Sequence, residues 1–229
     1  GYIKDFAHII GENTTVSEEE IFAYWNDEDV IRSYMKEYPF LTEEIFDPDV
    51  RYYLEGYLFP DTYDFYLNDD PVNVLEKFLS NFSNRVDENL LAQITDSGYT
   101  LHEILNVASM IEAEAANDGE RGDVASVIYN RLKYWDNPLL GMDSTVFYAA
   151  EQEGVTFSLE IDSPYNTYMY AGLPKGPICN PGLNSIKAAI NPNQTGYYYF
   201  ATAKDGLNRF FSSEDPFIAF INSDEYVGN

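Results

Sequence analysis

The 229-residue sequence contains one cysteine, Cys179, and two histidines, His8 and His102. A single cysteine excludes an intrachain disulfide and any zinc site built from several cysteines. Two histidines leave little for Cys/His catalysis or for zinc-dependent chemistry. The sequence also has no phosphate-binding loop, dinucleotide fingerprint or G-x-S-x-G nucleophile motif. If the chain is an enzyme, carboxyl groups remain as its acid and base, and no metal or other cofactor is expected.

Positive charge is scarce as well, with 13 Lys and Arg against 39 Asp and Glu and a formal net charge of −26. So acidic a chain repels the phosphate backbone, and nucleic acid is therefore not an expected partner. Apolar residues at 45% and aromatic residues at 16% exclude a disordered chain. No apolar run reaches the length of a membrane span. The length suits one mid-sized domain, alone or with a small companion.

The hydrophobic pattern predicts helices separated by loops and a few short strands. A capped helical region is expected over Thr14–Tyr38, and an amphipathic helix over Pro71–Val86. Thr100 and Glu103 form a capping box that opens a further helix, and another helix is expected over Glu120–Tyr134. Shorter elements are two helices at Ser185–Ile190 and Pro216–Ile221, and three strands at Gly154–Phe157, Thr167–Tyr170 and Tyr197–Ala203. This mixture predicts an α+β fold.

The helix that begins near Thr100 carries two glutamates within an apolar pattern. An advance of about 100° per residue places Glu112 between Leu101 and Leu105, at one edge of the apolar stripe. Glu114 falls near the opposite edge of the stripe. The remaining face, which we expect to point to solvent, carries His102, Asn106, Ser109 and Ala113.

Periodicity alone leaves two roles open for Glu112. A carboxyl group held at the wall of the core loses solvation, which raises its pKa and suits a general acid at neutral pH. The alternative is a structural glutamate paired with an arginine, for which Arg121 and Arg131 are available.

Six segments then complete a recognisable pattern: L-E-G-Y-L-F-P-D-T-Y (54–63), A-S-M-I-E-A-E-A (108–115), V-A-S-V-I-Y-N-R-L (124–132), M-D-S-T-V-F-Y (142–148), Y-N-T-Y (165–168) and G-L-P-K-G-P-I-C-N-P-G (172–182). On these segments the chain resembles the MltG/YceG-type endolytic lytic transglycosylases of bacterial cell walls, over residues 14–211. The resemblance implies that the substrate is peptidoglycan, cut between N-acetylmuramic acid and N-acetylglucosamine with a 1,6-anhydro product. It also implies that Glu112 is the general acid and then the base.

The family resemblance further implies a layout for the chain. All or part of a small LysM-like α/β module is expected in residues 1–50, and an α+β catalytic domain with its catalytic glutamate on a helix in residues 51–229. A membrane helix outside this chain would anchor the protein in the bacterial cell membrane, with the catalytic part facing the wall. Peptidoglycan glycan strands are the expected partner, and cell-wall synthesis proteins are further partners that the family implies.

The matched segments also suggest residues that bind the sugar. Glu114 would orient the neighbours of Glu112 or lie on a solvated rim, and the loop at 172–182 would border the cleft. A helix N-cap is the alternative role for the D-S-T group, and core packing is the alternative for the tyrosines. The substrate-binding candidates are Glu114, Asp143, Ser144, Thr145, Tyr165, Asn166, Thr167, Tyr168 and Asn180. We expect Glu112, Thr145 and Asn166 to line one groove.

One position departs from the family pattern. Family members often carry G-x-H-x-F after the strand near residue 200, and here Asn208 stands in place of the histidine. An amide forms hydrogen bonds but transfers no proton, so the assignment of the acid is unaffected.

Two other functions stay open at this point. A muramidase would hydrolyse the same bond and leave a reducing end. A catalytically weak wall-binding or scaffold protein would hold glycan without cutting it.

Overall fold

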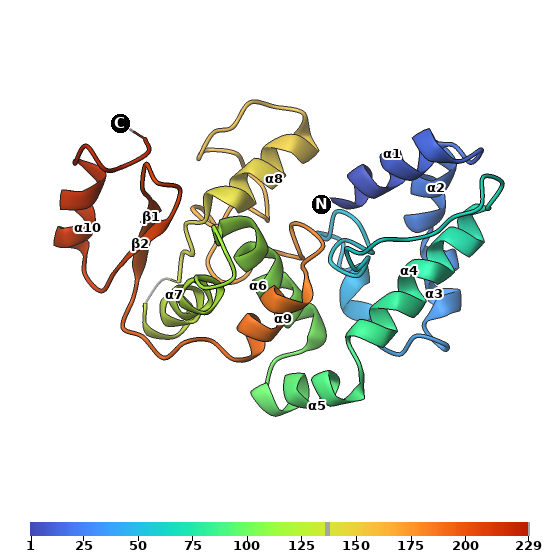
Figure 1. Ribbon diagram of the computed structural model, residues 1–229, viewed down its shortest axis with the longest axis horizontal. Helices are drawn as coiled ribbons and strands as arrows, with labels where there is room; N and C mark the ends of the chain where they lie inside the picture. Colours follow the sequence, from blue (N-terminus) through green and yellow to red (C-terminus); the bar gives the residue numbers. More distant parts are fainter. Residues whose placement is uncertain (136–137, 229) are drawn as a thin grey trace. The chain divides into compact units, whose positions relative to one another are not determined.

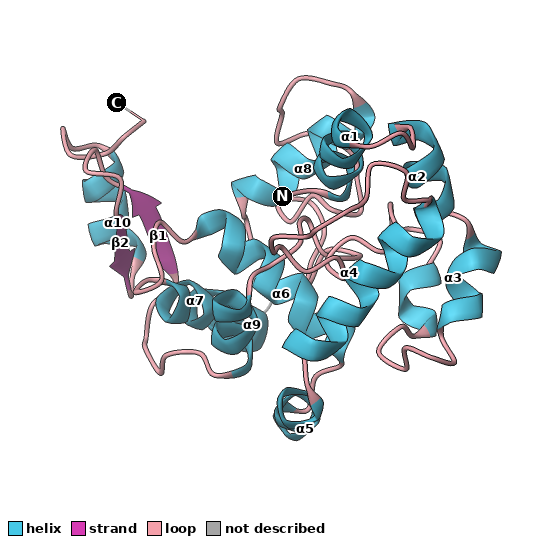
Figure 2. Ribbon diagram, turned by 45° about the vertical axis from the view of Figure 1, so that its right-hand side comes forward, coloured by secondary structure: helices cyan, strands magenta, loops and turns pink. Residues whose placement is uncertain are grey.

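The computed structural model describes residues 1–135 and 138–228, which form mainly helices (Figure 1). Figure 2 shows that the strands of this part of the chain form one small antiparallel pair. The elements are α1 (Ile3–Asn13), α2 (Glu18–Trp25), α3 (Glu28–Tyr34), the 3-10 helix η1 (Glu43–Phe46), α4 (Pro71–Arg85), α5 (Glu88–Ser97), α6 (Leu101–Glu114), α7 (Arg121–Tyr134), α8 (Asp143–Glu153), α9 (Leu183–Ile190), β1 (Tyr199–Thr202), β2 (Asn208–Phe211) and α10 (Glu214–Ile221). Helices with a small sheet confirm the predicted α+β class.

The chain divides into two compact units that are not continuous in sequence. Unit 1 contains residues 1–109 and 175–183, and unit 2 contains residues 110–174 and 184–229. The division therefore falls within α6 and does not coincide with residue 50. Residues 1–50 form α1, α2, α3 and η1 without a strand, so the α/β character expected there is absent. The LysM-like nature of this segment and its boundary at residue 50 stay predictions.

In unit 1, the helices form where the sequence supplies caps and apolar faces. The Asp70 side chain accepts from Asn73 N–H at the start of α4, and Pro71 occupies the first helical position. The buried face of α4 is the predicted one, and carries Val74, Leu75, Phe78, Leu79 and Phe82.

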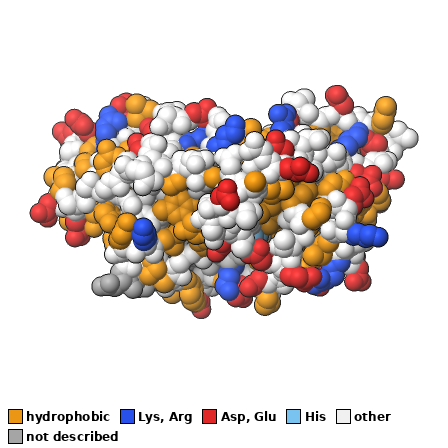
Figure 3. All heavy atoms as spheres, turned by 90° about the horizontal axis from the view of Figure 1, so that it is seen from below, with side chains coloured by type: hydrophobic (Ala, Val, Ile, Leu, Met, Phe, Trp, Pro, Cys, Tyr) orange, Lys and Arg blue, Asp and Glu red, His pale blue; other side chains and the backbone are white. Residues whose placement is uncertain are grey.

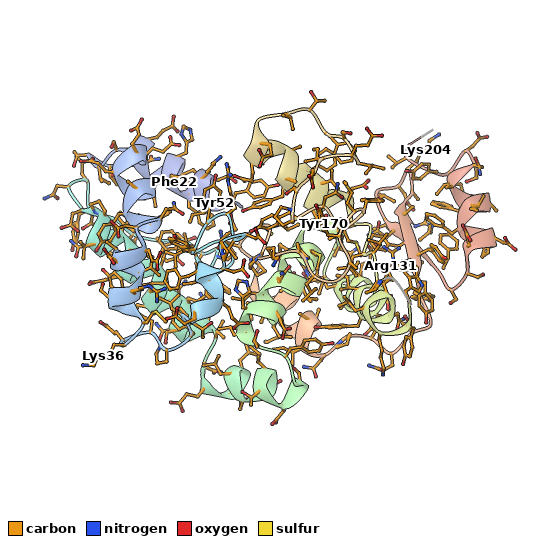
Figure 4. The ribbon with its side chains drawn as sticks, turned by 180° about the vertical axis from the view of Figure 1, so that it is seen from behind. Phe22, Lys36, Tyr52, Arg131, Tyr170 and Lys204 are labelled. Carbon is orange, nitrogen blue, oxygen red and sulfur yellow. The ribbon has the colours of Figure 1, made fainter. Side chains whose placement is uncertain are left out.

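The single helical region expected over Thr14–Tyr38 is instead broken. α2 ends at Trp25, and Asp27 caps a separate helix, α3, by accepting from Val30 N–H at 3.1 Å. A second capping residue within a helical pattern starts a new helix at a new angle. Phe22 of α2 packs edge-on against Tyr52 with ring centroids 5.1 Å apart (Figure 4).

Helix α6 begins at the predicted capping box, in which Thr100 N–H donates to Glu103 at 2.8 Å and Glu103 N–H donates to Thr100 Oγ1 at 3.2 Å. The prediction that its polar face points to solvent was wrong for His102, Asn106 and Ser109, which are buried. It was correct for Ala113, which is exposed. His102 is buried with Nδ1 3.0 Å from the Tyr57 hydroxyl, and Ser109 is buried and accepts from Ile178 N–H at 2.9 Å. Partners distant in sequence satisfy these polar groups, and a helical wheel contains no information about them.

In unit 2, the hairpin of β1 and β2 packs against α10 (Figure 1). The register pairs Tyr199 with Phe211 and Thr202 with Asn208. The third predicted strand is thus confirmed in part, since β1 lies within Tyr197–Ala203.

The other two predicted strands were wrong. Residues 154–157 form a turn and an extended loop, and residues 167–170 form turns. The carbonyl of Asn166 accepts from both Met169 and Tyr170 N–H at 3.0 Å, which closes a tight turn in place of a strand.

Carboxylate side chains are spread over the face seen in Figure 3 and do not gather at one place. Among the residues that the structure describes, no helix combines the length and apolarity needed to cross a membrane. Within the same residues, no three His, Cys, Asp or Glu side chains come together in a way that could hold a metal ion.

Candidate active site at the end of helix α6

Glu112 lies in the last turn of α6 and is held by two polar side chains. Its carboxylate is 3.1 Å from Arg121 Nη1 and accepts a hydrogen bond from the Ser185 hydroxyl at 2.7 Å. Arg121 also donates through Nε to Asp118 at 2.8 Å. The side chain of Glu112 is 30% exposed and that of Arg121 is 15% exposed, so the pair is not in a dry interior. The pairing with arginine that the sequence left open is present in the structure.

Glu114, two residues further along the same helix, has different surroundings. Two steps of about 100° direct the two carboxyl groups to well-separated sides of the helix. Glu114 lines a cavity of about 530 Å³ and accepts from Ser144 N–H at 3.2 Å. Burial raises the pKa of Glu114 above its ordinary value, and the nearby Asp143 raises it further. Ser144 and Arg131 act in the opposite direction, and the net direction favours the protonated acid.

Aromatic rings form much of the cavity wall. Trp135 stacks on Tyr198 with centroids 6.2 Å apart, and Tyr199 stacks on Phe217 at 5.2 Å. The volume lies within the range of about 300–1,000 Å³ that is usual for small-molecule sites. Flat rings beside carboxyl groups suit a sugar, because a pyranose has apolar C–H faces and polar edges. The rings that line the cavity belong to Trp135, Tyr168, Tyr199, Phe200, Phe217 and Tyr226.

Arg131 of α7 lies in the same wall, and Figure 4 labels it beside its helix. Its Nε donates to the Tyr198 carbonyl at 2.7 Å, and its Nη1 donates to the Leu140 carbonyl. Burial lowers the pKa of Arg131 to about 10, so the guanidinium remains charged at neutral pH. Arg131 therefore links the loop before α8 to the start of the hairpin, and it adds a cation close to Glu114.

Asp143 begins α8 and lines the cavity near Glu114. The Tyr168 hydroxyl donates to Asp143 Oδ1 at 2.6 Å, and burial together with this bond raises the pKa of Tyr168. The N-cap of α8 is Met142, so no member of the D-S-T group is the N-cap. Ser144 instead directs its N–H to Glu114. Two of the matched segments, 142–148 and 165–168, thus bring Asp143, Ser144 and Tyr168 to Glu114.

Four other sugar-binding candidates lie in the interior. Asn166 has no exposed surface, and its Nδ2 donates to the carbonyls of Leu159 and Ile161 at 2.9 and 2.8 Å. The hydroxyls of Thr145 and Thr167 are 2.9 Å apart, and both are buried.

Tyr165 is 4% exposed and packs on Tyr148 with ring centroids 5.0 Å apart. The groove expected to contain Glu112, Thr145 and Asn166 is therefore absent, because two of the three have no open surface.

Asn180 belongs to unit 1 and holds the backbone there. Its Oδ1 accepts from the N–H groups of Gly56 and Leu58 at 2.8 and 2.9 Å, and its Nδ2 donates to Glu55 at 2.9 Å. It is 1% exposed. Gly56 has φ +92°, and a Cβ built there would lie 2.5 Å from Pro177, so glycine is required where the two segments meet.

Asn208 joins the hairpin to the end of α6. Its Nδ2 donates to the Glu114 carbonyl and to the Glu120 carboxylate, each at 2.9 Å. Its own N–H donates to Glu120 at 3.2 Å, and its Oδ1 accepts from Thr202. Asn208 is thus a buried hydrogen-bonding residue behind Glu114.

A family match that covers most of the chain identifies the family. The sequence matches the family described as the YceG-like family over residues 2–218. This chain belongs to the YceG-like family.

Proteins similar to this YceG-like chain include two curated relatives. An endolytic murein transglycosylase of Bacillus subtilis is 38% identical over 208 residues, which are 89% of this chain and 57% of the relative. An endolytic murein transglycosylase of Streptococcus pneumoniae is 33% identical over 219 residues, which are 87% of this chain and 39% of the relative. The chain therefore spans between about two fifths and three fifths of the length of these relatives.

The fold agrees with a solved structure. The crystal structure of a yceG-like protein of Listeria monocytogenes superposes with a TM-score of 0.88 at 30% sequence identity. The match covers 96% of this chain and 73% of that one. The α+β fold is therefore shared with the family.

Sequence reasoning missed most of the cavity of this YceG-like chain. Trp135, Tyr199, Phe217 and Tyr226 were not candidates, and Arg131 was considered only as an ion-pair partner for Glu112. Arg131 lies in the matched segment at 124–132, which was a usable signal. The aromatic residues come from separate elements with no common motif, so only the folded chain brings them together.

Proposed function

We propose that this chain is the catalytic part of a peptidoglycan lytic transglycosylase that acts in assembly and remodelling of the bacterial wall. Membership of the YceG-like family and two relatives named endolytic murein transglycosylase support this proposal. We also propose, as the resemblance of the sequence implies, an N-terminal membrane anchor that places the catalytic part at the outer face of the cell membrane, and partners among cell-wall synthesis proteins.

One observation carries the catalytic proposal: a carboxyl group with a raised pKa lines an aromatic cavity. Glu114 would protonate the glycosidic oxygen as the C1–O bond breaks and positive charge develops at C1. The resulting carboxylate would then accept the proton of the C6 hydroxyl of the same sugar, whose oxygen forms the new bond to C1. Glu114 is restored, the 1,6-anhydro ring closes, and no water is consumed. Because the nucleophile is intramolecular, no second carboxylate is needed to activate water.

The surrounding residues have separate roles in this proposal. Asp143 favours the protonated state of Glu114 through its negative charge, and the charge would also stabilise the positive centre at C1. Tyr168 holds Asp143 in place, and Ser144 N–H fixes one oxygen of Glu114. The aromatic wall would hold the sugar rings and exclude water from the reacting carbon.

Glu112, the acid implied by the family resemblance, remains the alternative proton donor. In this structure its carboxylate is engaged by Arg121 and Ser185, and it is not among the residues that line the aromatic cavity. The geometry therefore favours Glu114 as the acid and Glu112 as a residue that fixes the start of α7.

The experiment that tests the reaction is analysis of its product. Purified sacculi are digested with the protein, and the released muropeptides are identified by mass spectrometry. We expect 1,6-anhydro ends, which are lighter than reducing ends by one water. Reducing ends would instead support a muramidase, and binding to sacculi without release would support a scaffold protein. The Glu114→Gln variant, prepared in the same way, controls for contaminating hydrolases.

A further inference from the structure

A second hollow, in unit 1, lies along the exposed face of α4. It has a volume of about 710 Å³ and lies between this helix and the segment that precedes it. Figures 1 and 2 show this segment, which leads into α4, running back along the helix. We call it the α4 groove. The residues that line it are Tyr38, Thr62, Tyr63, Asp64, Tyr66, Asp69, Asn73, Glu76, Lys77, Ser80, Asn81 and Asn84.

The helical side of the α4 groove has an unusual composition for a solvated helix face. Its residues recur at steps of three and four, so they form one continuous stripe, and three of them are asparagines: Asn73, Asn81 and Asn84. Asparagine is a poor helix former, and exposed helix faces usually carry Lys, Glu, Gln or Arg. Residues that oppose local propensity are expected at functional positions. These three asparagines, which we call the amide stripe, supply uncharged donors and acceptors beside the charged Glu76 and Lys77 of the same face.

The opposite side of the α4 groove supplies aromatic rings. Tyr66 is 75% exposed, although Lys77 Nζ lies 5.4 Å from its ring centroid and so supports one face of the ring. The other face of the ring is available for stacking. Tyr63 is fixed beside it, because Asn81 Nδ2 donates to its hydroxyl at 2.9 Å.

The charges of the α4 groove narrow the class of ligand. Lys77 is its one cation among the lining residues, and it is bound by Asp69 at 3.1 Å and by the Asp64 carbonyl at 2.6 Å. Asp69 is itself buried, and it also accepts from Tyr66 N–H. An anionic polymer would meet a surplus of carboxylates. Glu76 adds a further carboxylate to the lining. The Asn81 amide is already engaged by Asp61 and Tyr63. The uncharged groups that remain for a ligand are chiefly the amides of Asn73 and Asn84 and the ring of Tyr66.

We infer that the α4 groove binds a glycan through the uncharged hydroxyl and acetamide groups of its N-acetylated sugars. The C–H faces of such sugars would stack on Tyr66, and their hydroxyl and acetamide groups would bond to the amide stripe. In identifying the ligand as this kind of glycan, the inference rests on the proposed function. The groove itself is built entirely from residues of unit 1, whereas the catalytic cavity belongs to unit 2. The α4 groove would therefore bind glycan at a site distinct from the cavity in which the glycan is cut.

Binding of a linear β-1,4-linked hexamer of N-acetylglucosamine to the full chain tests the inference. In isothermal titration calorimetry we expect Tyr66→Ala to weaken binding by about tenfold, as the loss of one stacked ring predicts. Asn84→Ala should weaken it by about threefold to tenfold, the cost of one hydrogen bond. Tyr99→Ala is the matched control, since Tyr99 is an exposed tyrosine of unit 1 outside the groove, and it should bind like the parent.

Cleavage and groove binding are separated by two further variants. Glu114→Gln should keep the Tyr66-dependent binding, because Glu114 lies outside the α4 groove. Binding in the groove does not need cleavage, so it should be observed even if no anhydro product is released. Trp135→Ala removes a ring from the catalytic cavity, and the Tyr66-dependent component should survive it. Parent-like affinity of both Tyr66→Ala and Asn84→Ala would overturn the inference, as would loss of all binding in Trp135→Ala. Preferential Tyr66-dependent binding of a lysine-rich peptide would also overturn it.

Discussion

Glu112 and Glu114 carry the same carboxyl group in the last turn of α6, but their surroundings differ. On one side, Glu112 is bound by a guanidinium and a hydroxyl and remains partly exposed. On the other side, Glu114 lines the aromatic cavity and accepts a hydrogen bond from Ser144 N–H, and its pKa is raised by burial. Both residues are glutamates, and they lie two positions apart on the same helix. The difference teaches that the side chains packed around a carboxyl group, more than its position on the helix, decide whether it lies in an ion pair or has a raised pKa.

The largest expected effect separates the two glutamates directly. Glu114→Gln keeps the shape but donates no proton, so turnover of sacculi should fall by at least about 10²–10⁴-fold. Glu112→Gln should cost about tenfold or less, because only positioning is disturbed. Release of soluble muropeptides measures both, and thermal melts run alongside identify a variant that unfolds. The reverse order of the two losses would make Glu112 the acid, as the family resemblance implies.

The ion pair on the Glu112 side gives the next effect. Arg121→Met should lower the free energy of unfolding by about 1–2 kcal/mol, between the values for exposed and buried pairs. Denaturant titrations of this variant, of Glu112→Gln and of the double variant form a cycle whose coupling should exceed about 0.5 kcal/mol. Arg32→Met, which removes two more exposed pairs, with Glu28 and Glu43, is the control and should cost about 0.2–1 kcal/mol for each pair. Strict additivity would mean that the Glu112–Arg121 pair contributes nothing.

The cavity side has a pH signature. The folded pKa of Glu114 is raised above its unfolded value, so the stability it contributes is present below the unfolded pKa and is lost as pH rises through the folded pKa. Glu114→Gln removes this loss. The advantage of the variant in melting temperature should therefore grow as the pH rises above the unfolded pKa of a glutamate, about 4.3, and level off above the folded pKa. A pH-independent difference would contradict a raised pKa. Glu112→Gln, measured in the same buffers, provides the comparison.

The smallest effect concerns the support of Asp143. Tyr168→Phe removes the hydroxyl that donates to Asp143 and should cost about 0.5–1 kcal/mol of stability. Tyr170→Phe removes a similar bond, from Tyr170 to Asp162, outside the cavity. The two variants should melt alike, but turnover should fall a few-fold only for Tyr168→Phe. Equal turnover in both would show that Tyr168 has no positioning role.

The parts of the fold that depend on neighbouring residues were predictable. The capping box at Thr100 and the apolar spacing of α4 were both read from the sequence and found in place, because caps and amphipathic faces act over a few residues. The strands expected at 154–157 and 167–170 failed because β-branched and aromatic residues also occur in loops. Asn166 holds this region in turns through bonds to Leu159 and Ile161.

The site was less predictable than the fold. The pattern placed Glu112 and Glu114 on α6 and offered Arg121 as a possible partner for Glu112. It contained no information about Ser144 or the aromatic wall around Glu114, which come from other parts of the chain. Asp143, Ser144 and Tyr168 were recovered because they lie in segments that resemble the family. Thr145 and Asn166 lie in the same segments and proved to be interior. A motif therefore identified the right stretches of chain without separating the residues that support the cavity from those that face it.

The bonds of Asn180 have a consequence for how the chain acquires its structure. The N–H groups of Gly56 and Leu58 donate to Asn180 Oδ1, which lies more than a hundred positions later in the sequence. Most of unit 2 lies between these positions and is therefore synthesised before Asn180. During synthesis from the N-terminus, residues 1–109 of unit 1 therefore leave the ribosome before residues 175–183, which complete the unit. Neither unit can be obtained intact by a single cut of the chain. The covalent order of the segments makes completion of unit 1 a late, long-range step in folding.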